Sequence, residues 1–182
     1  MDASTRVLRV NTVELLRQRG NRRVADTVLD PADLEVVDER ITGPVDVHLA
    51  LESTLDGIEV TGTISVPWAD VCRRCLRPVD GLATVDVREL YQERVVDPDA
   101  FEIEGDQLDL KPMVRELVLL ELPDAPLCRD DCAGICPTCG ADRNESPCDC
   151  VTVDRDDRWA ALDDLRLAQD ERAGEPAPDE RE

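Results

Sequence analysis

Eight cysteines in four closely spaced pairs constrain this chain of 182 residues more than any other feature of its sequence. The pairs are Cys72-x2-Cys75, Cys128-x3-Cys132, Cys136-x2-Cys139 and Cys148-x-Cys150. The first residues contain no apolar run of signal-peptide length, so we expect a soluble cytoplasmic protein, and in that reducing compartment such pairs favour metal ligands over disulfides. Four pairs match the ligand count of two closed, tetrahedral zinc sites. The sequence therefore predicts two structural zinc ions.

Sequence proximity suggests how the pairs combine. The last four cysteines form one compact site, with eight residues between its halves: Cys136, Cys139, Cys148 and Cys150. The other site then combines the first four by default: Cys72, Cys75, Cys128 and Cys132. Spacing alone leaves open the opposite grouping, in which the first pair joins Cys136 and Cys139. It also leaves open a single zinc, an iron–sulfur cluster, or a redox role for the first pair.

The segment Cys136-Pro137-Thr138-Cys139-Gly140 is the most specific part of this pattern. Pro137 stiffens the turn between the two ligands. Gly140 permits the positive φ with which the chain turns away from a metal ion. We therefore expect a zinc-knuckle turn here.

Alternating apolar residues predict an antiparallel hairpin over about 45–52 and 58–66, with Asp56-Gly57 forming a type I′ turn between the strands. A third strand is expected at about 82–91. A helix over about 110–122, capped by Asp109 and containing Pro112 in its first turn, presents a stripe of Met113, Leu117 and Leu120 that can cover the sheet.

Weaker signals predict a short helix over about 12–19, capped by Asn11 and ended by Gly20, with Val13 and Leu16 facing the core. The segment 21–44 reads as a loop around a short strand near Leu34–Val37. The expected fold class is α+β: an antiparallel sheet covered by a helix, with a C-terminal zinc-ribbon or knuckle module. The expected domains are a body at 1–127, a cysteine-rich module at 128–150 and an acidic, weakly helical to disordered tail at 151–182.

Charge is unevenly distributed along this acidic chain, whose formal net charge is −21. Residues 1–23 are an exception, because they carry six arginines against two acidic residues. The candidate contacts with nucleic acid or another partner are arginines in this segment and on the first cysteine pair: Arg17, Arg19, Arg22, Arg23, Arg73, Arg74 and Arg77. If they share one face, they form a local basic patch suited to phosphates or to an acidic protein surface. The alternative is that they neutralise neighbouring carboxylates.

Several function classes are disfavoured. Four aromatic residues are too few for an extended base-stacking platform, and no apolar run approaches the length of a membrane span. No phosphate-binding glycine loop and no Ser-His-Asp set is visible, and the single histidine, His48, is expected to be solvated rather than a ligand. We therefore expect no enzymatic activity and no small-molecule substrate.

Ordered motifs over about residues 6–150 resemble the YceD family, described as large ribosomal RNA subunit accumulation proteins. They are Gly43-Pro44-Val45, Cys72-Arg73-Arg74-Cys75-Leu76-x-Pro78, Asp109-Leu110-x-Pro112 through Leu122-Pro123, Pro126-Leu127-Cys128, Cys136-Pro137-x-Cys139-Gly140-x-Asp142-x-Asn144 and Cys148-Asp149-Cys150. The resemblance implies a cytoplasmic bacterial factor, or its plastid relative, needed for accumulation or processing of large-subunit (23S) ribosomal RNA.

The same resemblance bears on the metal sites and on partners. Some family members keep the first C-x-x-C but lack the C-P-x-C-G cluster, which favours two independent sites. The expected partner is large-subunit rRNA or a pre-ribosomal particle. Two alternatives are an acidic adaptor that binds a basic ribosomal protein or other protein partner without touching RNA, and an oxidoreductase using Cys72 and Cys75.

Overall fold

The computed structural model describes residues 6–150 of the chain. They belong to two compact units, the first ending at Gly134 and the second beginning at Ile135. Cys128 and Cys132 therefore belong to the first unit, together with the sheet. The tail expected at 151–182 lies outside the described residues.

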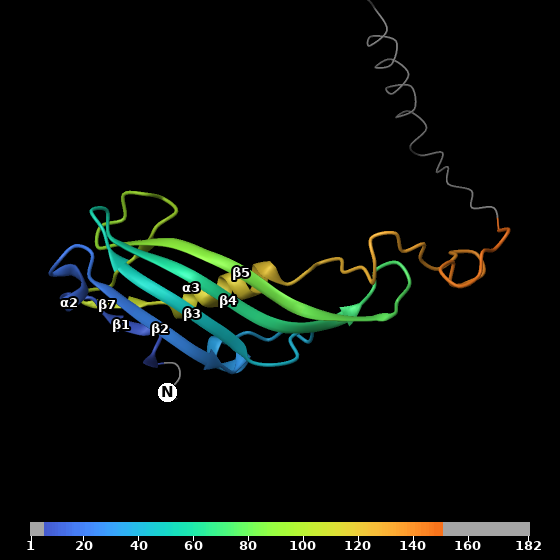
Figure 1. The fold of residues 1–182 in the computed structure, drawn as a ribbon, viewed down its shortest axis with the longest axis horizontal. Coiled ribbons are helices and arrows are strands. Elements are labelled where there is room, and N and C mark those ends of the chain that lie inside the picture. Colours follow the sequence, from blue (N-terminus) through green and yellow to red (C-terminus); the bar gives the residue numbers. More distant parts are fainter. Residues whose placement is uncertain (1–5, 151–182) are drawn as a thin grey trace, which may run out of the picture. The chain divides into compact units, whose positions relative to one another are not determined.

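The first unit is built on a five-stranded sheet with the order β2-β3-β4-β5-β6 (Figure 1). Its strands are β2 (Arg22–Leu29), β3 (Val45–Ser53), β4 (Ile58–Val71), β5 (Pro78–Gln92) and β6 (Phe101–Glu102). Neighbouring strands are antiparallel except for β5 and β6, which are parallel. A second, two-stranded sheet pairs β1 (Arg9–Asn11) with β7 (Gln107–Asp109).

The predicted hairpin and third strand are present, and β4 and β5 continue well beyond the predicted ends. The predicted type I′ turn is wrong. Ser53 pairs with Ile58, which leaves a four-residue connection from Thr54 to Gly57. A type I′ turn needs positive φ at both central residues, whereas only Gly57, at φ 147°, has one in this connection.

The segment 21–44, predicted as a loop, contains the eight-residue edge strand β2. Instead of the strand expected near Leu34–Val37, a 3-10 helix, η1, spans Pro31–Leu34 and ends at Glu35 with φ 56°. The predicted helix over 12–19 shortens to α2 (Val13–Leu16). Leu15 is its buried residue, while Val13, predicted to face the core, is exposed.

One helix, α3 (Lys111–Glu121), packs against β4 and β5 and closes the core, as predicted. Asp109 accepts a hydrogen bond from the Lys111 backbone N–H at the start of the helix. Met113 and Val118 are buried, but Leu120 is 73% exposed, so its predicted place in the packing stripe is wrong. The core is aliphatic except for Tyr91, which stacks on Phe101.

Candidate metal centres

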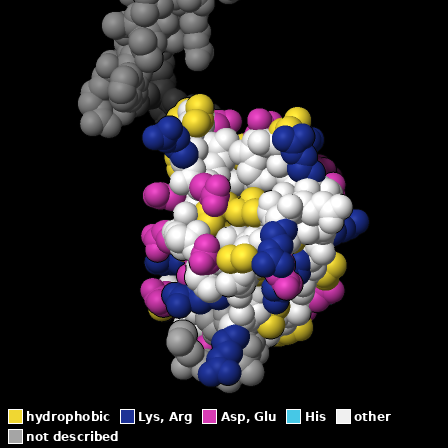
Figure 2. Space-filling view, turned by 90° about the vertical axis from the view of Figure 1, so that its left-hand side faces the viewer, with side chains coloured by type: hydrophobic (Ala, Val, Ile, Leu, Met, Phe, Trp, Pro, Cys, Tyr) yellow, Lys and Arg dark blue, Asp and Glu magenta, His cyan; other side chains and the backbone are white. Residues whose placement is uncertain are grey.

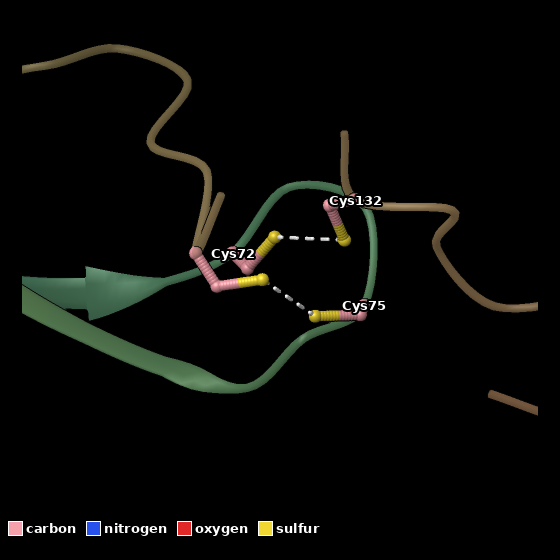
Figure 3. A group of neighbouring side chains, drawn as sticks. Cys72, Cys75 and Cys132 are labelled. Atoms are coloured by element: carbon pink, nitrogen blue, oxygen red, sulfur yellow. Dashed lines mark hydrogen bonds between the residues drawn. The ribbon is translucent and has the colours of Figure 1, made fainter. Parts of the chain in front are cut away.

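The first four cysteines meet at the end of the sheet. Cys72 and Cys75 lie in the turn between β4 and β5, and Cys128 and Cys132 lie in the segment after α3. Cys72 Sγ is 3.8 Å from Cys132 Sγ, and Cys75 Sγ is 3.5 Å from Cys128 Sγ. All four sulfurs lie within 4.8 Å of one another. In Figure 3 the labelled side chains of Cys72, Cys75 and Cys132 converge from both segments on one point.

This first quartet fits a tetrahedral metal ion. Four thiolates held at zinc–sulfur bond length are about 3.8 Å apart, close to the two separations above. Cys72, Cys75 and Cys132 are buried, with Val79 and Leu127 packed against them. Such a closed, all-sulfur set suits a structural ion rather than a catalytic one, which needs an open position. The quartet links the β4–β5 turn to the segment after the covering helix.

Hydrogen bonds hold the segment after α3 against the β4–β5 turn. The Arg73 backbone N–H donates to the Pro126 carbonyl at 2.9 Å. Arg74 Nη1 donates to the carbonyls of Asp130 at 3.3 Å and Cys132 at 3.0 Å. Gly134 has φ 71°, and a Cβ built there would lie 2.9 Å from the Arg74 carbonyl oxygen. The two chain segments therefore approach too closely at this point for a side chain.

The last four cysteines form a second quartet inside the second unit, where Ile135 and Asp142 form an isolated β-bridge. Their sulfurs also lie within 4.8 Å of one another. Cys136 is buried, whereas Cys139 is exposed. Arg143 Nη2 lies 3.8 Å from Cys136 Sγ, so a cation stands beside the sulfur cluster.

The two C-x2-C turns share one backbone structure. In the first, the Cys72 N–H donates to the Arg77 carbonyl at 2.7 Å, and the Leu76 N–H donates to the Cys72 carbonyl at 2.9 Å. The second repeats both bonds at 2.8 Å, from Cys136 to Ala141 and from Gly140 to Cys136. Gly140 has the predicted positive φ, 74°. Leu76 adopts the same conformation, at φ 59°, which sequence reasoning missed because a leucine carries no signal for it.

Backbone N–H groups also favour one thiolate in each quartet. Burial alone would raise the pKa of Cys72, but the N–H groups of Cys128, Cys75 and Arg74 lower it to about 6. The N–H groups of Cys139 and Thr138 lower the pKa of Cys136 to about 5. The neighbouring cysteines then titrate late: the side chain of Cys75 helps to raise the pKa of Cys128 to about 12.

In the second quartet, Cys150 is affected in the same way as Cys128. Hydrogen bonding to the side chain of Cys139 is the main cause that raises the pKa of Cys150 to about 12. Each quartet therefore combines one stabilised thiolate, Cys72 or Cys136, with at least one thiol of raised pKa, Cys128 or Cys150, that a cation would have to deprotonate. The sulfur chemistry and the separations fit a soft divalent cation in both quartets.

The structure brings together the two cysteine groups that sequence proximity favours, rather than the crossed grouping. Cys148 and Cys150 lie in a segment without helix or strand assignment. Cys128 and Cys132 are joined by a turn in which the Cys132 N–H donates to the Arg129 carbonyl. Among the residues that the structure describes, His48 belongs to neither quartet: its Nδ1 lies 3.3 Å from Asp26 Oδ1 at the exposed side of the sheet.

The candidate arginines do not form one patch. Arg22 and Arg23 lie on β2 rather than in a loop at the end of α2, level with Glu52 of β3 and Glu59 of β4. The β4–β5 turn lies at the other end of β4, about 40 Å along a strand of this length. Figure 2 views the end of the first unit where α2 lies, and shows Lys and Arg interspersed with Asp and Glu there.

The arginines at the first C-x2-C turn, which we call the knuckle arginines, are Arg73, Arg74 and Arg77, and the side chains of Arg73 and Arg74 differ in their contacts. The Arg74 guanidinium binds the backbone of the segment after α3. The Arg73 side chain is exposed and has no partner among the described residues. The condition for a single patch is therefore not met, because the length of the sheet separates Arg22 and Arg23 from the arginines of the β4–β5 turn.

No helix within residues 6–150 is both long enough and apolar enough to cross a lipid bilayer.

Residues 60–166 match the model of a family described as large ribosomal RNA subunit accumulation protein YceD. An uncharacterized protein of Mycobacterium tuberculosis is 35% identical over 146 residues, covering 75% of this chain and 70% of its own length. An uncharacterized protein of Mycobacterium leprae is 33% identical over 145 residues, covering 75% of this chain and 65% of its own.

A plant protein named large ribosomal RNA subunit accumulation protein YCED homolog 1, chloroplastic, from Arabidopsis thaliana, is 32% identical over 74 residues. That match covers 41% of this chain and 23% of the plant protein. No solved structure matches the chain. The matched segment of the family model includes all eight cysteines and more than half of the chain. The chain therefore belongs to the YceD family.

Proposed function

We propose that this protein is a non-enzymatic, zinc-binding factor that supports accumulation or processing of large-subunit (23S) ribosomal RNA in the bacterial cytoplasm. The family description supports the ribosomal RNA role, and the two cysteine quartets support the zinc. The single observation that carries the zinc proposal is the repeated turn at the two C-x2-C pairs, because in each copy the two cysteine sulfurs lie within 4.8 Å of each other. Zinc in the first quartet would join the sheet to the segment after α3; in the second it would hold the small unit together.

The arginines at the α2 end support a contact with rRNA phosphates. Arg17 and Arg19 follow α2, and Arg22 and Arg23 are exposed at the start of the edge strand β2. Arginine binds phosphate through a planar fork of donors, so these exposed side chains are suited to positioning an RNA backbone without reading its sequence. Of the knuckle arginines, Arg74 donates to the protein's own backbone, so the exposed Arg73 is the candidate contact for a partner.

Depletion of the protein in its host, followed by measurement of 23S rRNA relative to 16S rRNA and of subunit profiles, tests this function. We expect a deficit of 23S rRNA and of large subunits. Wild-type protein should restore both, and the double variant Cys72→Ser/Cys75→Ser should not. A variant at an exposed residue outside both quartets, Leu120→Ala, serves as the matched control. Unchanged rRNA and normal subunit profiles after depletion would contradict the proposal.

A second candidate function is an adaptor that binds a basic ribosomal protein without touching RNA. The observation in its favour is the exposed side of the sheet, where Asp26, Asp46, Glu52 and Asp86 lie on β2, β3 and β5. Such a surface attracts a basic partner. Pull-down with and without nuclease separates the two functions, because a partner that survives RNA digestion supports the adaptor and one that disappears supports RNA binding.

A further inference from the structure

The outer face of the sheet changes from polar to largely apolar side chains along the β4–β5 hairpin. Strand alternation places Pro67, Ala69 and Val71 on the face opposite the core, since Val66 is buried and Trp68 packs against the core. Near the middle of the sheet, the cross-strand pairs on this face are polar: Thr61 with Arg88, Thr63 with Asp86, and Ser65 with Thr84. Beyond β3, they are Pro67 with Leu82, Ala69 with Asp80, and Val71 with Pro78.

We call the outer face of this end of the hairpin, together with Leu76 of the turn, the ribbon tip: Pro67, Ala69, Val71, Leu76, Pro78, Asp80 and Leu82. Three of its large side chains are strongly exposed, with Leu82 at 62%, Leu76 at 59% and Val71 at 43%. Isolated exposed aliphatic residues are ordinary on protein surfaces, but several along one strand face, as at Pro67, Val71, Pro78 and Leu82, are typical of an interaction site.

The left-handed backbone conformation of Leu76 has a free-energy cost. A residue with a Cβ pays about 1–2 kcal/mol to adopt the left-handed conformation. In the second knuckle, glycine fills the same position without that penalty. The exposed Leu76 side chain gains little burial within the chain to offset the strain. The reason for a leucine here is therefore to be sought in a contact outside the chain.

The charges at the tip select the kind of partner. Arg74 is bound to backbone carbonyls, whereas the exposed Arg73 has no partner within residues 6–150. The exposed Asp80, opposite Ala69, places one carboxylate on the same face, which disfavours phosphate further. A guanidinium beside aliphatic side chains complements an apolar protein surface that also presents a carboxylate. RNA is a poor match for the aliphatic part, because proteins bind unpaired bases mainly by stacking aromatic rings or guanidinium groups on them.

We propose that the ribbon tip docks onto a protein component of the large-subunit precursor, with Leu76 and Leu82 as apolar anchors and Arg73 paired to a carboxylate of that protein. This inference rests on the proposed function, which supplies the particle. The knuckle end would thus contact protein, while the arginines at the α2 end contact rRNA.

Photo-crosslinking tests which class of molecule the tip contacts. Full-length, metal-loaded protein carrying p-benzoylphenylalanine in place of Leu82 is bound to purified large-subunit precursor particles and irradiated. The control carries the same group in place of Leu120, which is 73% exposed on α3. We expect a protease-sensitive, nuclease-resistant adduct from position 82 and none from position 120. An adduct with rRNA, or no adduct although the protein co-sediments, overturns the inference alone. Failure to co-sediment contradicts the proposed function, and this inference with it.

Leu76→Gly supplies the second test, because it removes the anchor without disturbing the backbone. We expect binding to the precursor particles to weaken about tenfold, while the metal content of the free protein stays unchanged and its unfolding midpoint stays equal or rises slightly. Leu120→Ala should bind like the wild type. Unchanged affinity of Leu76→Gly would overturn the inference.

Discussion

Leu76 and Gly140 occupy the same position in two copies of one turn. Each directly follows the second cysteine of a C-x2-C pair, each donates its backbone N–H to the carbonyl of the first cysteine, and each has a left-handed backbone, at φ 59° and 74°. Only glycine adopts this conformation without a steric penalty.

The two positions should therefore respond oppositely to exchange. Leu76→Gly relieves about 1–2 kcal/mol of strain but adds about 0.5–1 kcal/mol of unfolded-state entropy, so the free energy of unfolding should stay equal or rise slightly. Gly140→Leu introduces the strain and should weaken metal binding by the second quartet by roughly tenfold. Denaturant unfolding and chelator competition measure the two effects. Strong destabilisation by Leu76→Gly would contradict the equivalence of the two turns.

Arg74 should stabilise the first quartet, whereas its neighbour should not. Arg74→Met removes two hydrogen bonds to the carbonyls of Asp130 and Cys132, and we expect it to lower the free energy of unfolding by about 1 kcal/mol, since this side chain is partly solvated. Arg73→Met is the matched control and should leave stability unchanged. Equal effects in denaturant titrations would mean that the Arg74 contacts contribute nothing.

Alanine substitutions at Gly134 and Gly20 distinguish the free-energy cost of a steric clash from the cost of a left-handed backbone. Both have positive φ, 71° and 79°, but a Cβ at Gly134 meets the Arg74 carbonyl at 2.9 Å, while one at Gly20 meets nothing within 4 Å. Gly20→Ala should cost about 1 kcal/mol from its backbone alone. Gly134→Ala should cost clearly more and should weaken metal binding by the first quartet, measured by chelator competition. If the two variants unfold alike, the close approach has no energetic role.

Metal binding by the first quartet should be strongly pH-dependent. At pH 7 the pKa of Cys72, near 6, leaves it a thiolate, whereas the pKa values of Cys75 and Cys128 are raised and keep both protonated. A metal ion must then displace at least two protons, so its affinity rises with pH, by roughly a hundredfold per unit around neutrality. Zinc titration of a Cys136→Ser/Cys139→Ser variant at several pH values measures the slope. A pH-independent affinity would argue against binding to these thiols.

Sequence patterns predicted the elements whose side chains alternate between core and solvent. In β3, Val45, Val47, Leu49 and Leu51 all point inward, so the strand was evident from the sequence. The edge strand β2 was missed because its exposed positions include Val24 and Val28, while the polar Arg23 and Thr27 share the side of the strand on which Ala25 and Leu29 are buried. Pairing with β3, rather than an apolar pattern of its own, places that strand.

The cysteine grouping followed from spacing because short connections limit which sulfurs can meet. The arginines gave no comparable signal, since their separation depends on the length of β4, and the sequence predicted that strand to be shorter. The left-handed Leu76 and the contacts of Arg74 depend on how the segment after α3 crosses the turn, which local sequence does not encode.

Metal stoichiometry tests the central claim most directly. Elemental analysis of the full chain, purified without added metal, should give about two zinc ions per chain. Cys132→Ser and Cys150→Ser should each reduce the value to about one, because each disables one quartet. A wild-type value near zero, or two variants that both lose all metal, would contradict the account of two independent zinc sites.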